Sequence, residues 1–310
     1  MARYLGQRLI LVLPVLLLVS TVVFAIMYVL PGDPIQLMLA GAEAGASTPE
    51  RIAQLRHNLC LDQPLYVQYF RFLTNILRGD LGMSIRFNSP VSSLVGVAAL
   101  QTLQLSLAGL LVALLLGLPL GIIAALYEDT WVDSLSMVVA LLGVSMPLFW
   151  LSQLVILTVS IRLQWLPAIS GATAKGMILP ALMLGAVSAT LISRLTRSTL
   201  LEVLRNDYIR TARAKGLKER IVIYRHAMKN ALIPVVTVVA LQFGGMLSGA
   251  VITETVFSRP GLGTLVVKAI LWKDYPLVQG TVLITALSYV LVNVLVDLLY
   301  AWLDPRISYG

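Results

Sequence analysis

Residues 96–127 read GVAALQTLQLSLAGLLVALLLGLPLGIIAALY, a run of 32 residues without a charged side chain. About 20 predominantly apolar residues in a helix cross the hydrocarbon of a bilayer. The run is long enough for one crossing, and it is too short for two crossings with a turn between them. The residues that precede it, 87–95, are more polar and contain a proline. We therefore predict one spanning helix within 87–127.

The whole chain has the composition of a protein that lies in lipid. Apolar residues make up 58% of it and charged residues 12%, against roughly half and a quarter in soluble domains. The sequence predicts an all-α integral membrane protein with six transmembrane helices, since uncharged stretches of spanning length recur. These stretches are 9–32, 87–127, 134–161, 176–193, 230–253 and 275–296. The first is read as a retained helix rather than a cleaved signal, because no Ala-x-Ala-like cleavage site follows it at 30–34.

The distribution of charge predicts the orientation of the chain. Ten of the 23 Lys and Arg residues lie within 194–229, and a short basic loop marks the cytoplasmic side of a membrane protein. Such clustering argues against a nucleic-acid surface. With six spans, both termini are then predicted to be cytoplasmic. The loop 128–133 holds three acidic residues and no basic one, which counts against this orientation.

The titratable residues give little support to catalysis or to ion coupling. Glu254 and Asp297 are the ionisable candidates in or beside the predicted spans, and both are predicted to lie near helix ends, close to water. His57 and His226 fall in loops, and Cys60 is the single cysteine. We predict no catalytic residue and no metal or cofactor site. The chain also lacks the G-x-x-x-x-G-K-[ST] loop, so ATP would have to be bound by another chain.

The segment between the fourth and fifth predicted spans has a helical hairpin pattern. Asn206 and Asp207 are suited to cap a short helix over 208–215, and Gly216 stands where a left-handed residue would end it. Ile209 and Ala212 give this helix a small apolar face between basic residues. We predict that this face docks into a groove of a partner.

A second helix is predicted to follow from Lys218, with one stripe that comprises Leu217, Ile221, Tyr224 and Met228. Two simpler interpretations remain open for this region. It is either a loop that only signals topology, or an amphipathic helix that rests on anionic lipid.

The segment 31–96 is predicted to be an external helical insert after the first span. Thr48 and Pro49 begin one amphipathic helix, and Pro64 begins a second one that ends before Gly79 and Gly82. The two helices are expected to pack on each other and on the membrane domain, with docking of another protein as the alternative.

At this point a family resemblance becomes visible. The stretch DYIRTARAKG at 207–216, followed by HAMKNALIP at 226–234, resembles the coupling loop of ABC importer permeases of the dipeptide, oligopeptide and nickel class. In that loop the pattern is Glu-Ala-Ala, three residues, then Gly. Ala212 and Gly216 fit it, whereas Arg210 and Thr211 replace Glu and Ala, as in the peptide-type branch. Further matches along the chain are LPGDP at 30–34, LDQP at 61–64, GDLG at 79–82, PGLG at 260–263, DYP at 274–276, DLLY at 297–300 and LDPRI at 303–307.

The resemblance implies a type I ABC importer transmembrane domain that occupies 1–310, with the coupling loop at 194–230. It implies a permease in the bacterial cytoplasmic (inner) membrane that imports peptides or similar small solutes and is not itself an enzyme. The implied partners are a second, similar permease in a heterodimer, two ATPase subunits that hold ATP and Mg, a solute-binding protein and membrane lipid. The residues implied in coupling to the ATPase are Asp207, Tyr208, Ile209, Arg210, Thr211, Ala212, Arg213, Ala214, Lys215 and Gly216.

The substrate is left open by the resemblance. Nickel chelates, glutathione or other small solutes are alternatives to peptides. An ion-coupled secondary carrier remains as an alternative of a different class.

Overall fold

The computed structural model describes residues 13–25, 53, 62–142 and 145–303. Within these ranges all regular secondary structure is helical, and strand-like pairing is limited to one isolated bridge between Met83 and Pro90. The chain forms two compact units. The hairpin unit comprises Gln101–Pro260 and Leu291–Gly310, and the N-terminal unit comprises Ala2–Leu100 and Gly261–Val290. Each is described separately below.

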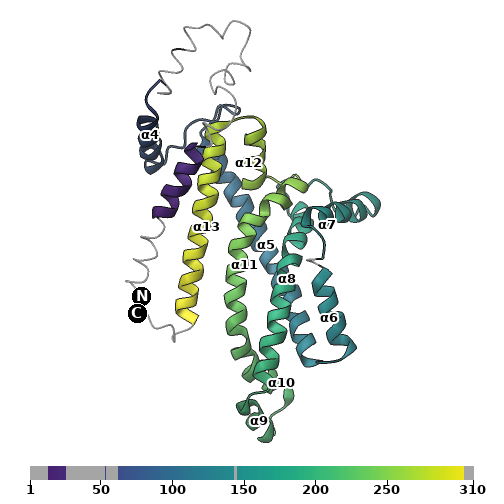
Figure 1. Ribbon diagram of the computed structural model, residues 1–310. Coiled ribbons are helices and arrows are strands. Elements are labelled where there is room, and N and C mark those ends of the chain that lie inside the picture. The colour runs from purple at the N-terminus through teal and green to yellow at the C-terminus, as the bar shows by residue number, and fades with distance from the viewer. Residues whose placement is uncertain (1–12, 26–52, 54–61, 143–144, 304–310) are drawn as a thin grey trace. The chain divides into compact units, whose positions relative to one another are not determined.

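Four helical segments in the described part of the chain are long and apolar enough to cross a membrane. They are Val91–Leu126, Ala174–Leu204, Glu219–Leu247 and Tyr275–Val296. The first is helix α5 (Figure 1), which is continuous over 36 residues, so the prediction of a single span within 87–127 is confirmed. The others correspond to α8 (Ala174–Leu204), to α11 (Met228–Val256) with the turns before it, and to α13 (Tyr275–Leu303).

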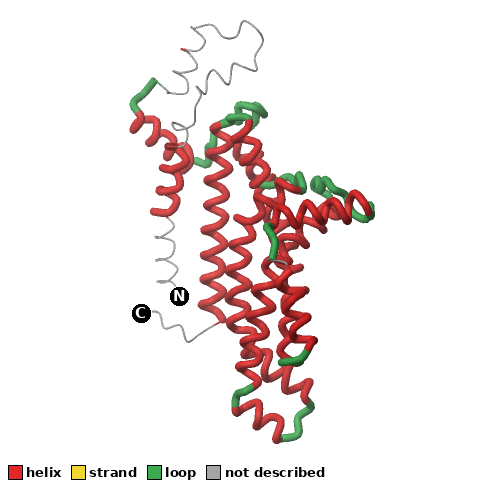
Figure 2. Tube along the Cα trace, turned by 45° about the vertical axis from the view of Figure 1, so that its right-hand side comes forward, coloured by secondary structure: helices red, strands yellow, loops and turns green. Residues whose placement is uncertain are grey.

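The hairpin unit is built around α8. In its most apolar window 67% of the residues are buried, against 28% in the corresponding window of α5. Figures 1 and 2 show α5, α8 and α11 running alongside one another. Their shared core contains Leu105, Ala113, Leu184, Ile192, Val235 and Ala250. Helix α8 is therefore the central element on which the other two pack.

Small residues let α5 and α8 approach closely. A Cβ built on Gly121 would lie 2.5 Å from the carbonyl oxygen of Ser193, and one on Gly117 would lie 2.9 Å from that of Ala189. Glycines spaced four residues apart lie on the same helical face, and such a face permits backbone-to-backbone packing in membranes. The sequence requirement at these two positions is therefore the absence of a side chain.

The predicted third span, 134–161, is interrupted in the structure. The chain instead forms α6 (Trp131–Leu142), α7 (Leu148–Val155) and the π-helical turn η1 (Ile156–Arg162). Pro147 precedes α7 with an extended backbone, at φ −55° and ψ 132°. Proline lacks the N–H that would continue a helix, so the direction changes here. In Figures 1 and 2 the α7–η1 segment runs across α8 rather than along it.

In the N-terminal unit, helix α4 (Leu65–Leu77) packs against the helix over 13–25. Phe24 lies against the rings of Tyr69 and Phe72, and the hydroxyls of Thr21 and Tyr69 are 2.6 Å apart. The second predicted helix of the insert is thus confirmed. Gly79 and Gly82, which follow it, have φ of 77° and 81°. The first predicted helix of the insert lies outside the described residues, apart from residue 53.

Helix α12 (Leu262–Leu271) was not predicted from the sequence. It packs with the first turns of α5 and with α13 in a second core, to which Val91, Val95, Leu262 and Leu277 belong. With only 10 residues it is too short for the spanning-length criterion that located the other helices.

Candidate coupling hairpin

The predicted helix, glycine turn and helix are present in the hairpin unit. Helix α9 (Asp207–Ala214) follows the end of α8, and α10 (Glu219–Ile221) with the π-helical turn η2 (Val222–Ala227) leads into α11. Figures 1 and 2 show this hairpin at one end of α8 and α11. Gly216 has a φ of 75°, as expected for a left-handed residue that ends α9. Asn206 occupies the N-cap position, but its side chain makes no capping hydrogen bond.

The predicted apolar docking face of α9 is wrong, because it is used within this chain. Ile209 is fully buried, and Ala212 is 8% exposed. The cluster that encloses them includes Ala125 of α5, Leu200 of α8 and Ala231 of α11. Burial of these apolar side chains against three long helices holds the hairpin in place. Helix α9 is therefore fixed to the helices behind it.

The predicted stripe on the second helix is not the face that packs on the chain's own helices. Leu217, Ile221 and Tyr224 are exposed, whereas the buried residues of this segment are Val222, Ile223 and Ala227. The turn η2 is π-helical, with hydrogen bonds from i to i+5. The wider turn shifts which residues share a face, so a pattern read with the 3.6-residue period of an α-helix selects the wrong set.

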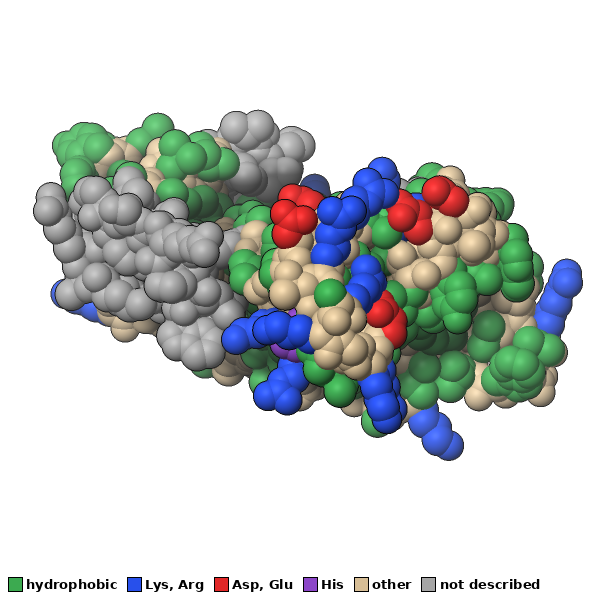
Figure 3. Space-filling model, turned by 90° about the horizontal axis from the view of Figure 1, so that it is seen from below, with side chains coloured by type: hydrophobic (Ala, Val, Ile, Leu, Met, Phe, Trp, Pro, Cys, Tyr) green, Lys and Arg blue, Asp and Glu red, His purple; other side chains and the backbone are tan. Residues whose placement is uncertain are grey.

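The outward surface of the hairpin is strongly basic. In the described segment 202–229, eight Lys and Arg residues are exposed against three exposed acidic residues, Glu202, Asp207 and Glu219. Figure 3 shows Lys and Arg side chains gathered at this end of the molecule. The basic residues are Arg205, Arg210, Arg213, Lys215, Lys218, Arg220, Arg225 and Lys229.

One ion pair closes the two arms of the hairpin. The guanidinium of Arg213 in α9 lies 2.6 Å from the carboxylate of Glu219 in α10. Its hydrogen bonds with Glu219 raise the pKa of Arg213. Because both side chains are partly exposed, the pair contributes little to stability. It links α9 to α10 across the turn at Gly216.

The acidic loop that counted against the predicted orientation is paired with Arg197 of α8 and with Arg205, the residue that follows α8. Arg197 donates two hydrogen bonds to Asp133, at 2.7 and 2.5 Å, and Arg205 lies 2.7 Å from Glu128. The acidic charge of the loop is therefore balanced by the basic end of α8. The acidic charge of the loop is therefore no argument against a cytoplasmic position for this end of the molecule.

These two ion pairs should differ in strength. Asp133 is 8% exposed and bonded in a bidentate manner, whereas Arg205 is 72% exposed. We expect Asp133→Asn to reduce the free energy of unfolding by about 1–3 kcal/mol, and Glu128→Gln to reduce it by less than about 1 kcal/mol. Thermal unfolding of the detergent-purified variants measures both. Equal effects would show that burial does not strengthen the first pair.

Glu254 lies two residues before the end of α11, so its predicted position near a helix end is confirmed, and it belongs to a buried polar cluster. Glu254 is fully buried and Arg259 is 1% exposed. Thr102 donates to the carboxylate of Glu254 at 2.6 Å. Arg259 donates to the carbonyl oxygen of Gly171 at 3.1 Å and to Gln101 at 3.2 Å. The cluster thus joins α5, the segment before α8 and the end of α11.

The remaining candidate side chains bring no further chemistry together. His226 is half-buried in the hairpin, and the side chain of Asp297 lies outside the described residues, as do His57 and Cys60. In the described part of the chain there is no group of three or more His, Cys, Asp or Glu residues that would hold a metal ion.

Transport system permease proteins are similar to this chain over its whole length. The chain is 42% identical over 337 aligned residues to the dipeptide transport system permease protein DppB of Alkalihalophilus pseudofirmus, and 43% identical over 309 residues to the glutathione transport system permease protein GsiC of Salmonella paratyphi A. Both alignments cover 100% of each chain.

Solved structures show the same fold at low sequence identity. A chain of the MetNI methionine ABC transporter aligns with a TM-score of 0.58 and 17% identity, and covers 68% of this chain and 96% of its own. A chain of an amino acid ABC transporter aligns with a TM-score of 0.55 and 14% identity, and covers 68% of this chain and 94% of its own. The fold is therefore that of an ABC importer permease.

Family matches cover both ends of the sequence. Residues 1–91 match the N-terminal region of binding-protein-dependent transport system membrane components, and residues 117–309 match the binding-protein-dependent transport system inner membrane component family. The chain belongs to this family of inner membrane components and is a permease subunit of an ABC importer.

Proposed function

We propose that the outward surface of α9, with the glycine turn at Gly216, is the site at which an ATPase subunit engages this permease. The observation that carries the proposal is the contrast between the two faces of α9. Ile209 and Ala212 are buried against the chain's own helices, whereas Tyr208, Arg210 and Arg213 are exposed. A helix whose buried face is anchored to its own chain and whose polar face is exposed can bind a partner and transmit the partner's movement to the helices behind it.

The anchoring defines what such a push would move. The buried face of α9 contacts residues of α5, α8 and α11 in one cluster. A displacement of α9 would therefore shift the ends of three long helices together rather than deform a loop. Closure of ATP-bound ATPase subunits is the event that would bias this element between two arrangements.

The proposed assembly follows from the family and from the charge distribution. It comprises this permease, a second and similar permease, two ATPase subunits that hold ATP and Mg, and an external solute-binding protein. We place the basic hairpin and both termini in the cytoplasm and assign six spans, the third of which begins with α6. The pairing of the acidic loop with Arg197 and Arg205 supports this orientation.

The proposed substrate class is small peptides, including dipeptides and glutathione. The support is the full-length similarity to permeases named for dipeptides and for glutathione. Both are compounds with peptide bonds and charged ends. Nickel chelates remain an outcome to be tested, since the binding protein selects the solute.

A change of Gly216 to valine tests the coupling role. Gly216 has a φ of 75°, and a Cβ there would meet nothing within 4 Å. Valine therefore fits the space, but it resists the left-handed backbone, at a cost of about 1–2 kcal/mol. We expect substrate-stimulated ATP hydrolysis by the reconstituted complex to fall about five- to tenfold. Membrane insertion should be unchanged.

Gly216→Asn is the matched control, because asparagine tolerates this backbone conformation. It should retain most of the stimulated hydrolysis. A second measurement is crosslinking from Arg210→Cys, in a chain that carries Cys60→Ser, to the ATPase subunit. If this position crosslinks to no ATPase subunit and the valine variant remains coupled, α9 is not the coupling helix. Uptake by this chain alone, driven by an ion gradient, would instead establish a secondary carrier.

A further inference from the structure

In the N-terminal unit, the loop before α5 and the turn between α12 and α13 present exposed apolar and basic side chains. We name this surface the turn patch, and it comprises Met83, Arg86, Phe87, Leu271, Trp272 and Lys273. We propose that an acidic face of the external solute-binding protein docks on the turn patch. This inference rests on the assembly and orientation proposed above, and it adds the place and the chemistry of the contact.

A buried carboxylate holds the two segments of the turn patch together. Asp274, which precedes α13, is fully buried. One of its oxygens accepts hydrogen bonds from the hydroxyl of Ser84 at 2.5 Å and from the backbone N–H of Arg86 at 3.0 Å. Its other oxygen accepts a hydrogen bond from the N–H of Leu277 at 3.2 Å. The loop over 83–90 is thereby tied to the start of α13.

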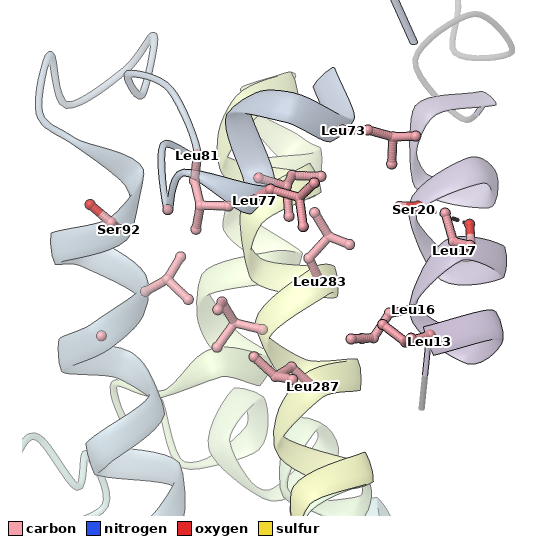
Figure 4. A pocket seen from close by; sticks show the side chains of 15 residues that line it. Leu13, Leu16, Leu17, Ser20, Leu73, Leu77, Leu81, Ser92, Leu283 and Leu287 are labelled. Carbon is pink, nitrogen blue, oxygen red and sulfur yellow. Dashed lines mark hydrogen bonds between the residues drawn. The ribbon is translucent and has the colours of Figure 1, made fainter. Parts of the chain in front are cut away.

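The loop is also fixed by its own backbone and by the core beneath it. The N–H of Ser84 donates to the carbonyl oxygen of Ser89 at 2.9 Å. Leu81, just before the loop, lies beside Gly280 of α13 and packs on the second core (Figure 4). A surface that is already ordered loses little conformational entropy when a partner binds. The turn patch is therefore preorganised for a contact.

The loop places two side chains on the ring of Trp272. The ring of Phe87 meets it edge-on, with centroids 5.4 Å apart, and the guanidinium carbon of Arg86 lies 6.0 Å from its centroid. Trp272 nevertheless remains 40% exposed and Phe87 44%. Tryptophan and arginine are enriched among the residues that dominate the binding energy of protein interfaces. The turn patch therefore has the composition of a protein interface.

The position of the turn patch along α5 argues against membrane lipid as its partner. Arg194 of α8 is exposed and follows Ser193, which packs on Gly121 of α5. An exposed guanidinium marks the edge of the hydrocarbon, and about 30 Å of hydrocarbon then extends along α5 from Gly121 to about Gln101. Val91 is about 15 Å further on, whereas the headgroup layer is about 5–8 Å thick. The loop before Val91 therefore lies in the water outside the membrane.

The charge of the turn patch favours an acidic partner. Arg86 and Lys273 are exposed, as is Lys268 one turn earlier in α12. Residues 81–100 and 261–273 contain no acidic residue. Cations without neighbouring acids attract an acidic protein surface and raise the rate of encounter with it.

Two members of the proposed assembly have external surfaces that could meet the turn patch. The opposite end of α5 packs on the hairpin, so the turn patch is external when the hairpin is cytoplasmic. A second permease of similar sequence would bring like charges to the contact, and such a juxtaposition is costly. A solute-binding protein with an acidic face meets no such cost and is the partner to which the proposal commits.

Charge reversal tests the proposal in the assembled complex. The solute-binding protein of the same transporter, fluorescently labelled and loaded with a dipeptide, is titrated without ATP onto the complex in lipid nanodiscs. We expect Arg86→Glu and Trp272→Ala each to raise the Kd at least tenfold. Lys175→Glu is the matched control, because Lys175 is an exposed cation at the start of α8 in the hairpin unit. It should change the Kd less than twofold.

The possible outcomes separate this proposal from the coupling role of the hairpin. An unchanged Kd in both patch variants would overturn the proposal. An equal loss with Lys175→Glu would also overturn it, because attraction would then depend on overall charge. Gly216→Val acts on the ATPase side and should leave the Kd measured without ATP unchanged. If the binding protein fails to bind the parent complex, the proposed assembly is contradicted together with this contact.

The accessibility of position 272 provides a second measurement. Trp272→Cys, in a chain that carries Cys60→Ser, should react with a membrane-impermeant maleimide in the complex without binding protein. Saturating binding protein should slow this reaction at least fivefold. A cysteine that does not react in the free complex would show that another part of the complex covers the turn patch. That result, or equal labelling with and without the binding protein, would overturn the proposal.

Discussion

Gly121→Ala is expected to reduce the free energy of unfolding by about 2–3 kcal/mol, a large effect for one added methyl group. The new Cβ would lie 2.5 Å from the carbonyl oxygen of Ser193 and 2.7 Å from the Cβ of Thr196. The first of these contacts is with backbone, which has no rotamer to change. Helices α5 and α8 must therefore separate, and the packing of the central helix is loosened along with them.

Gly96→Ala is the matched control for this prediction. It is the same substitution in the same helix, but its Cβ would meet nothing within 4 Å. Alanine is the better helix former by about 1 kcal/mol, so this variant should be as stable as the parent or slightly more so. The midpoint of thermal unfolding of the detergent-purified chains decides the matter. If both variants behave alike, the close approach of α5 and α8 is not what these glycines provide.

Arg259→Met is expected to have the largest effect of any single substitution discussed, about 3–5 kcal/mol of destabilisation. Burial lowers the pKa of Arg259, and the charge of Glu254 opposes this shift. Removal of the guanidinium leaves the fully buried carboxylate of Glu254 without that compensating charge. It also frees the carbonyl oxygen of Gly171 from a hydrogen bond.

The double variant Glu254→Gln with Arg259→Met separates charge balance from lost packing. When both charges are absent no buried charge remains uncompensated, so the double variant should recover about half of the lost stability. Lys268→Met, at an exposed cation of α12, should change stability by less than about 0.5 kcal/mol. Chemical or thermal unfolding of the parent, Arg259→Met, Glu254→Gln and the double variant measures the cycle, and Lys268→Met is the control. Purely additive losses would mean that the two charges do not interact.

The long helices were predictable because burial in lipid places the same demand on every residue of a span. The 32 uncharged residues at 96–127 were sufficient to predict α5, and the same reasoning located α8, α11 and α13. Local rules also placed α9, because a left-handed glycine is needed where a short helix ends. The course of the third segment was not predictable in the same way, because length and polarity do not report the change of direction at Pro147.

Contacts between distant parts of the chain were beyond this reasoning. The pairing of Asp133 with Arg197 joins residues 64 positions apart, and that of Thr102 with Glu254 joins residues 152 positions apart. No local period records such partners. They decide whether an acid is exposed on a loop or balanced by a cation.

The sequence by itself determined that this chain is a helical membrane protein with a basic hairpin, because hydrophobicity, charge and turn chemistry act on neighbouring residues. Only the tertiary structure decided which side of that hairpin is available to a partner. Ile209 and Ala212 form the apolar face of α9. The sequence pattern is the same whether a partner or the chain's own helices bury this face. The contacts with α5, α8 and α11 settle the choice, since apolar surface is buried by whatever lies next to it in space.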